Sequence, residues 1–105
     1  MTRTKFQFVL QWPAASVDDY DEMTSFEDAV VAALGDVGHV DGHDAGAGQM
    51  NIFVHTDDPL RAFERIKSLP RPVRLPAGLK VAYRAFDGDS YEVLYAQGLT
   101  SFVVP

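Results

Sequence analysis

The sequence predicts an α+β fold in which an antiparallel sheet carries two helices on one face. Three observations lead to this prediction: segments whose apolar residues alternate with period two, two segments with helical spacing, and turns marked by glycine or proline between them. The chain has 105 residues, the length of one domain, and 47% of them are hydrophobic, as is normal for a protein with one core. We therefore expect a single α+β domain over residues 1–105.

The first strand is predicted from strict alternation. Its apolar residues occupy every second position and are separated by Gln7, Val9 and Gln11, which is typical of a half-buried strand. Pro13 ends this strand, because proline cannot donate a hydrogen bond to the ladder. The apolar residues are Phe6, Phe8, Leu10 and Trp12.

A helix is predicted next, over residues 24–34. Thr24 and Glu27 have the spacing of a capping box, in which each side chain covers a free backbone N–H. Apolar residues then recur at helical spacing, and Gly35 suits a left-handed helix end. The apolar face comprises Phe26, Ala29, Val30, Ala33 and Leu34.

The second half of the chain repeats the alternation of strand and helix. The run Asp57-Asp58-Pro59 predicts a helix start, with an aspartate cap and proline in the first turn, and Pro70 ends that helix. Glycines within 44–48 and the run Asp87-Gly88-Asp89 predict hairpin turns. The predicted elements are strands over 38–43 and 49–55, a helix over 59–68, strands over 80–86 and 91–95, and a tail over 102–105 that docks or adds an edge strand.

This order of elements is βαββαβ with an additional C-terminal hairpin strand. It predicts the ferredoxin-like, or split βαβ, arrangement, an antiparallel sheet with both helices on one face. Three further runs are informative together: Val40-Asp41-Gly42-His43-Asp44, Gly48-Gln49-Met50-Asn51-Ile52-Phe53 and Asp57-Asp58-Pro59. Through them the chain resembles a family of small, uncharacterised bacterial proteins over roughly residues 5 to 95. It implies a compact bacterial α+β protein and transfers no activity or catalytic residue.

Charge and composition exclude several function classes. The net charge is −6, and residues 1–58 hold eleven acids and two bases whereas residues 59–105 hold four acids and seven bases. An acidic domain repels phosphate backbones, so we expect no nucleic-acid partner. The absence of cysteine excludes disulfides and thiolate sites and suits a reducing compartment. Without a signal peptide or an apolar run of about 18 residues, we expect a cytoplasmic protein with no membrane partner.

Histidine and carboxylate side chains gather in the predicted hairpin. If both strands are regular, these residues share the sheet face opposite the helices, together with Gln7 and Gln11 of the first strand. The candidate open-face binding residues are His39, Asp41, His43, Asn51 and His55. Imidazole and carboxylate are ligands for zinc, iron or copper, although an open sheet face is also polar simply because it meets water. A one-residue slip, or a bulge at Gly42, would separate the group.

Two functions follow as hypotheses. The acidic run Asp18, Asp19, Asp21 and Glu22 is a candidate docking surface for a basic partner, or else a solvated loop that complements the helix dipole. We expect first a small acidic interaction or regulatory module that binds another protein, and a homodimer through a sheet edge or face is a further hypothesis. The alternative is a small-molecule or metal-binding domain, including an enzyme, that uses the open face. No clear nucleophile lies near that face, so binding is favoured over catalysis, and no catalytic residue, metal or cofactor is assigned.

Overall fold

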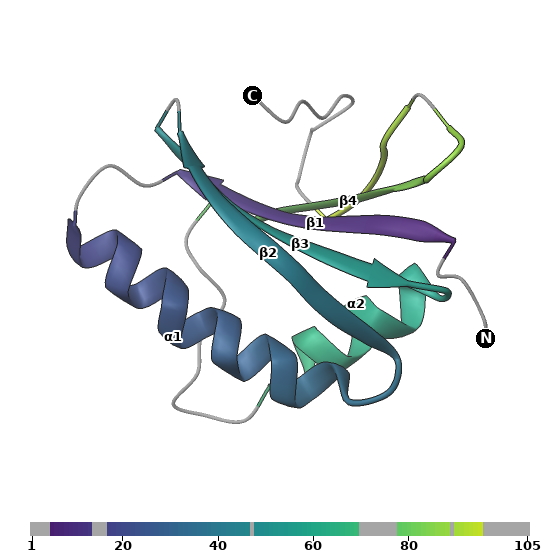
Figure 1. Ribbon diagram of the computed structural model, residues 1–105, viewed down its shortest axis with the longest axis horizontal. Coiled ribbons are helices and arrows are strands. Elements are labelled where there is room, and N and C mark those ends of the chain that lie inside the picture. Colours follow the sequence, from purple (N-terminus) through teal and green to yellow (C-terminus); the bar gives the residue numbers. More distant parts are fainter. Residues whose placement is uncertain (1–4, 14–16, 47, 70–77, 89, 96–105) are drawn as a thin grey trace.

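Five strands and two helices make up the part of the chain that the computed structural model describes, residues 5–13, 17–46, 48–69, 78–88 and 90–95 (Figure 1). In chain order the elements are β1 (Phe6–Pro13), α1 (Val17–Leu34), β2 (Gly38–Gly46), β3 (Gln49–Thr56), α2 (Pro59–Lys67), β4 (Lys80–Ala85) and β5 (Glu92–Tyr95). The predicted tail segment over 102–105 lies outside the described residues.

The strands form one sheet in the order β2-β3-β1-β4-β5, and every neighbouring pair is antiparallel. Helix α1 links β1 to β2, which lie on either side of β3, and α2 links β3 to β4, which lie on either side of β1. Both helices cover the same face of the sheet (Figure 1). The predicted α+β fold with an antiparallel sheet is confirmed, and β5 is the added hairpin strand.

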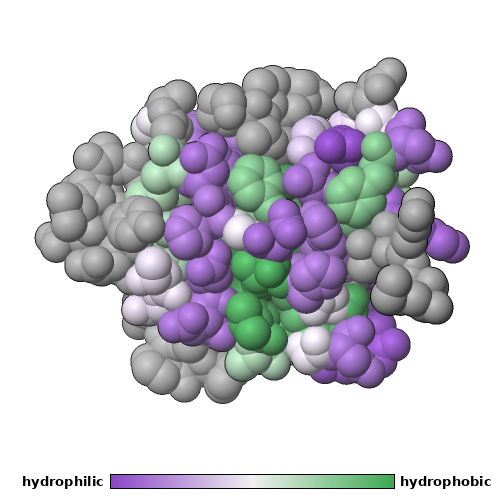
Figure 2. All heavy atoms as spheres, in the orientation of Figure 1, coloured by the Kyte–Doolittle hydropathy of each residue, from purple (hydrophilic) through white to green (hydrophobic). Residues whose placement is uncertain are grey.

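The core lies between the helices and this face, where the predicted alternation is borne out. Phe8, Leu10 and Trp12 of β1 point into it together with every second residue of β3. The buried apolar residues of the core are Phe8, Leu10, Trp12, Met23, Phe26, Val30, Leu34, Met50, Ile52, Val54, Ala62, Phe63, Ile66, Leu79 and Val81. Hydrophilic residues cover much of the described surface in the view of Figure 2, with a hydrophobic area between α1 and β2.

Helix α1 begins seven residues earlier than the predicted 24–34. Thr24 is therefore inside the helix, and the predicted capping box with Glu27 is wrong. Met23 is fully buried one turn before Phe26, so the apolar stripe continues towards the N-terminus. Acidic residues are also favourable in the first turns, where the helix dipole is positive. The predicted end is confirmed, because Gly35 has a left-handed φ of 54°.

Helix α2 starts as predicted. The side chain of Asp58 accepts a hydrogen bond from the backbone N–H of Arg61 at 3.1 Å, and Pro59 occupies the first turn, where its missing N–H costs nothing. The helix ends at Lys67, one residue before the predicted limit of 59–68. Within the described residues, neither helix is long and apolar enough to cross a membrane.

Strand β2 contains an irregularity that determines where its side chains point. Val40 pairs with Val54 and Gly42 pairs with Phe53, so Asp41 is an extra residue without its own partner. Such a β-bulge reverses the facing of every residue that follows it. The side-chain directions predicted for β2 therefore hold only up to Val40, whereas those predicted for β3 hold along the whole strand.

The sequence predicted that the sheet face opposite the helices is open to solvent. The structure shows instead that the centre of this face is buried. Val9 and Ala82 on this face are fully buried, and Gln11 is only 3% exposed. The β4–β5 hairpin rises on this side of the sheet (Figure 1), and Tyr91 at its far end donates a hydrogen bond to Gln7 at 3.3 Å. We call this face the outer face.

Candidate functional site

Three of the predicted binding residues meet at one end of the outer face. His39 of β2 and His55 of β3 are cross-strand partners, with ring centroids 5.2 Å apart in an edge-to-face arrangement. The Oδ2 atom of Asp41 lies 3.5 Å from Nε2 of His55. One ligand atom from each of the three side chains lies within 4.8 Å of the other two. We call this group the His–Asp–His cluster.

The local backbone explains why these side chains converge. Antiparallel pairing places directly opposed residues on the same face, so His39 and His55 are neighbours. The bulge adds Asp41 two residues later, with its carboxylate turned towards His55. A bulge that re-aims one side chain is a recurrent feature of functional sites.

His43 does not join the cluster, and the prediction that it shares their face is wrong. After the bulge, His43 pairs with Ile52, whose side chain points into the core. The Nδ1 atom of His43 lies 2.8 Å from Oε2 of Glu27 on α1. His43 therefore connects the edge strand to the helix.

Asn51 keeps the predicted face but is completely buried there. Its Oδ1 accepts a hydrogen bond of 2.9 Å from Nε2 of Gln11, and its own Nδ2 has no hydrogen-bond partner among the residues that the structure describes. A fully buried amide that bonds its neighbour is a structural element of the sheet rather than a group offered to solvent. Asn51 is thus buried on the same face on which His39 and Asp41 are exposed, and it is not part of the cluster.

Phe86 forms a wall beside the cluster and was not singled out from the sequence. Its ring packs edge-to-face on His55, with centroids 4.9 Å apart, and remains 42% exposed. Arg84 braces the turn that carries it, since its guanidinium donates to the carbonyls of Ala85, Phe86 and Gly88 at 3.2–3.4 Å. The only sequence signal was an aromatic residue directly before a predicted turn.

A hollow of about 390 Å³ opens at the same end of the sheet. It is lined by Lys5, Phe6, Ala85, Phe86 and Asp87, so Phe86 belongs both to this hollow and to the wall of the cluster. The lining combines apolar side chains with one cation and one anion. Because Phe6 and Ala85 are cross-strand partners that alternate with the outer-face residues, their side chains lie on the helix side of the sheet and not beside the cluster.

The cluster has the composition and spacing of a metal site. Metal–ligand bonds of about 2.1 Å place neighbouring ligand atoms about 3.0–3.4 Å apart. The contact between Asp41 and His55, at 3.5 Å, is slightly longer than that spacing, and a ligand atom of His39 lies within 4.8 Å of both. The side chain of Asp41 is 57% exposed and can adjust, whereas that of His55 is 21% exposed and contacts the rings of His39 and Phe86. Two imidazoles and one carboxylate suit zinc or another first-row transition metal ion.

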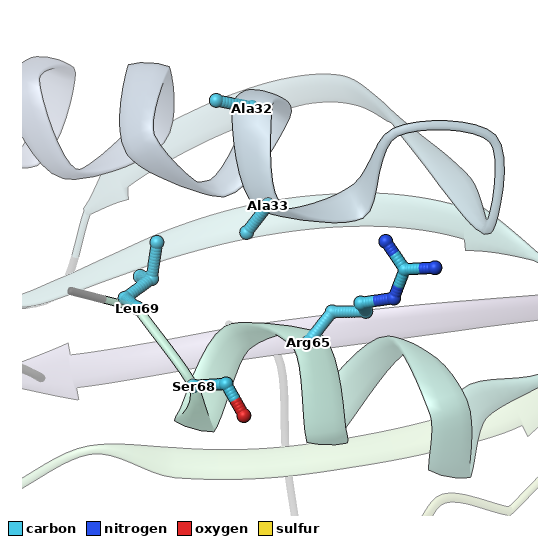
Figure 3. A pocket seen from close by; sticks show the side chains of 5 residues that line it. All are labelled: Ala32, Ala33, Arg65, Ser68 and Leu69. Atoms are coloured by element: carbon cyan, nitrogen blue, oxygen red, sulfur yellow. The ribbon is translucent and has the colours of Figure 1, made fainter.

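A second hollow, of about 300 Å³, lies between α1 and α2 (Figure 3). Its lining consists of Ala32, Ala33, Arg65, Ser68 and Leu69. The hydroxyl of Ser68 already donates to the backbone carbonyl of Glu64 at 2.9 Å. Arg65 is then the one charged side chain in this lining, and no set of ligating groups converges there.

The acidic residues predicted as a docking surface lie in a helix and not in the expected loop. Asp18, Asp19, Asp21 and Glu22 belong to the first turns of α1 and not to a loop, because the helix starts at Val17. Their side chains lie outside the described part of the structure. Docking of a protein partner at this run stays a prediction.

A tyrosine near the other edge of the sheet has a perturbed pKa. Tyr83 of β4 donates a hydrogen bond of 3.0 Å to Oε2 of Glu92 on β5. This hydrogen bond raises the pKa of Tyr83 above its ordinary value, and burial and the negative charge of Glu92 act in the same direction. The neutral phenol therefore joins the last two strands.

Comparisons with protein-family models, with curated proteins and with solved structures found no match for the chain. The resemblance to a bacterial family and the cytoplasmic location stay predictions.

Proposed function

We propose that the protein is a metal-binding domain that holds one divalent first-row transition metal ion through His39, Asp41 and His55. The supporting observation is the convergence of three ligand atoms within 4.8 Å on the outer face. The alternation of β2 and β3 and the bulge between them bring the three ligands together. This proposal takes the small-molecule or metal-binding alternative over the interaction module, because the described residues support it directly.

We also propose that the fold is ferredoxin-like. The order β2-β3-β1-β4 supports this assignment, since each helix connects two strands that flank an antiparallel neighbour, and β5 is an addition at the β4 edge. Domains of this arrangement carry both binding and catalytic functions. The fold is therefore compatible with a metal site, and the argument for one rests on the side chains.

Three protein ligands leave at least one coordination position open on the metal. Sites with three protein ligands and an open position bind water or a substrate there, whereas structural zinc sites use four protein ligands. A metal held at this edge would act as a Lewis acid towards whatever occupies that position. This is a site for ligand binding rather than for holding the fold together.

The test is a titration of the purified protein with Zn²⁺ by isothermal titration calorimetry at pH 7.5. We expect one ion per chain. Removing a ligand by His39→Ala or His55→Ala should weaken Zn²⁺ binding by roughly 10–100-fold or more. Loss of a residue that only hydrogen-bonds a metal ligand already has an effect of this size. Because an imidazole must be neutral to ligate, affinity should fall as the pH is lowered to about 5.5.

The chain supplies its own control in His43. The side chain of His43 is hydrogen-bonded to Glu27 on the helix side of the sheet and is not part of the cluster. His43→Ala should therefore change Zn²⁺ affinity less than twofold. Circular dichroism of each variant checks that it is folded. Equal loss of affinity in His43→Ala and His39→Ala, or binding without a defined stoichiometry, would contradict the proposal.

A further inference from the structure

The surroundings of the His–Asp–His cluster indicate what kind of ligand would occupy the open metal position. Phe86 touches His55 with its ring and presents 42% of its surface to solvent. Arg84 braces the backbone of the turn that carries this ring, so an aromatic contact stands next to a proposed metal ligand. Nothing in the packing of the core requires this exposed ring.

The ring of Phe86 is the apolar part of the site. The other apolar residues of the neighbouring hollow, Phe6 and Ala85, are cross-strand partners on the helix side of the sheet, whereas Phe86 packs on His55. A single small molecule bound at the cluster therefore has the ring of Phe86 as its apolar contact.

Charge then selects the head group of that molecule. A bound divalent ion outweighs the single negative charge of Asp41. The ion and its three ligands, +2 from the metal and −1 from Asp41, are therefore positive together, although the chain as a whole carries −6. A positive site favours an anionic ligand atom on the metal.

We infer that the site binds small organic anions, with the anionic head group on the metal and an apolar or aromatic body against Phe86. This inference rests on the proposed metal site and names its ligand class. The metal binds the anionic head group, and the ring of Phe86 contacts the apolar part of the same molecule. A simple anion such as acetate would bind the metal without contacting Phe86.

The test uses the full chain loaded with Co²⁺, whose visible spectrum reports changes in the coordination shell. Two chelators with the same head group are compared, acetohydroxamate with a methyl body and benzohydroxamate with a phenyl body. Burial of the phenyl ring against Phe86 should make benzohydroxamate bind about tenfold more tightly, which corresponds to roughly 1.4 kcal/mol. In Phe86→Ala, compared with the wild type at saturating Co²⁺, this preference should fall below about twofold.

Tyr95→Ala is the matched control, since Tyr95 is an equally exposed aromatic residue of β5 that packs against Phe63 and not against the cluster. It should retain the tenfold preference. A wild-type protein that binds Co²⁺ but prefers neither chelator would overturn this inference and leave the metal site standing. Preference retained in Phe86→Ala would also overturn it. A protein that binds no Co²⁺ would overturn both proposals.

Discussion

The buried amide pair on the outer face can be tested by removing one partner. Gln11 and Asn51 are 3% and 0% exposed, and their side chains are joined by a hydrogen bond of 2.9 Å. The change Gln11→Leu keeps a side chain of similar length but leaves both polar atoms of Asn51 without a partner, since Nδ2 already has none. An unsatisfied buried polar group costs about 1–3 kcal/mol. We expect Gln11→Leu to lower the free energy of unfolding by that amount.

The assay is thermal unfolding followed by circular dichroism. For a domain of this size, each 1 kcal/mol shifts Tm by about 4–8 °C, so a loss of 2 kcal/mol would lower Tm by roughly 8–16 °C. The double variant Gln11→Leu with Asn51→Val removes both polar partners. Because neither of the two positions then holds an unpaired amide, its stability should return to within about 1 kcal/mol of the wild-type value.

The control is Gln7→Leu, the same change on the same strand and face, where the side chain is only half-buried and accepts a longer bond from Tyr91. We expect a smaller loss there, below about 1 kcal/mol. If Gln11→Leu left Tm unchanged, Asn51 would have to be solvated, and the description of a covered outer face would be refuted. The same holds if the double variant were no more stable than Gln11→Leu.

Two further predictions concern contacts between elements. Because the pKa of Tyr83 is raised in the folded protein, folding favours the neutral phenol. The stability that this contributes is fully present below the ordinary tyrosine pKa of about 10 and is lost as the pH rises through the higher folded value. Glu92→Gln should lower the ionisation midpoint of Tyr83 in a titration of absorbance at 295 nm. An unchanged midpoint would remove the role of Glu92. Glu27→Ala breaks the 2.8 Å contact to His43 and should cost about 1 kcal/mol in urea unfolding, whereas Glu64→Ala, which breaks an exposed pair with Lys67, should cost at most about 0.5 kcal/mol. Equal losses would mean that His43 does not tie β2 to α1.

Local patterns predicted most of the architecture. The alternation of Phe8, Leu10 and Trp12 identifies β1 and the face that it buries, because successive side chains of a strand point to opposite sides. Asp58 and Pro59 locate the start of α2 to the residue, since cap geometry depends on a few neighbouring groups. The start of α1 was misplaced, because an acidic run is equally compatible with a loop and with the positive end of a helix.

The candidate site was only partly predictable. The sequence by itself determined that histidine and carboxylate groups lie close together in one hairpin, and that they alternate with apolar residues. Only the tertiary structure decided which of them meet. The extra residue Asp41 shifts the facing of β2, so that His39, Asp41 and His55 converge whereas His43 turns towards α1. A strand has a side-chain period of two, so a single inserted residue reverses everything after it, and pairing with β3 is what locates that insertion.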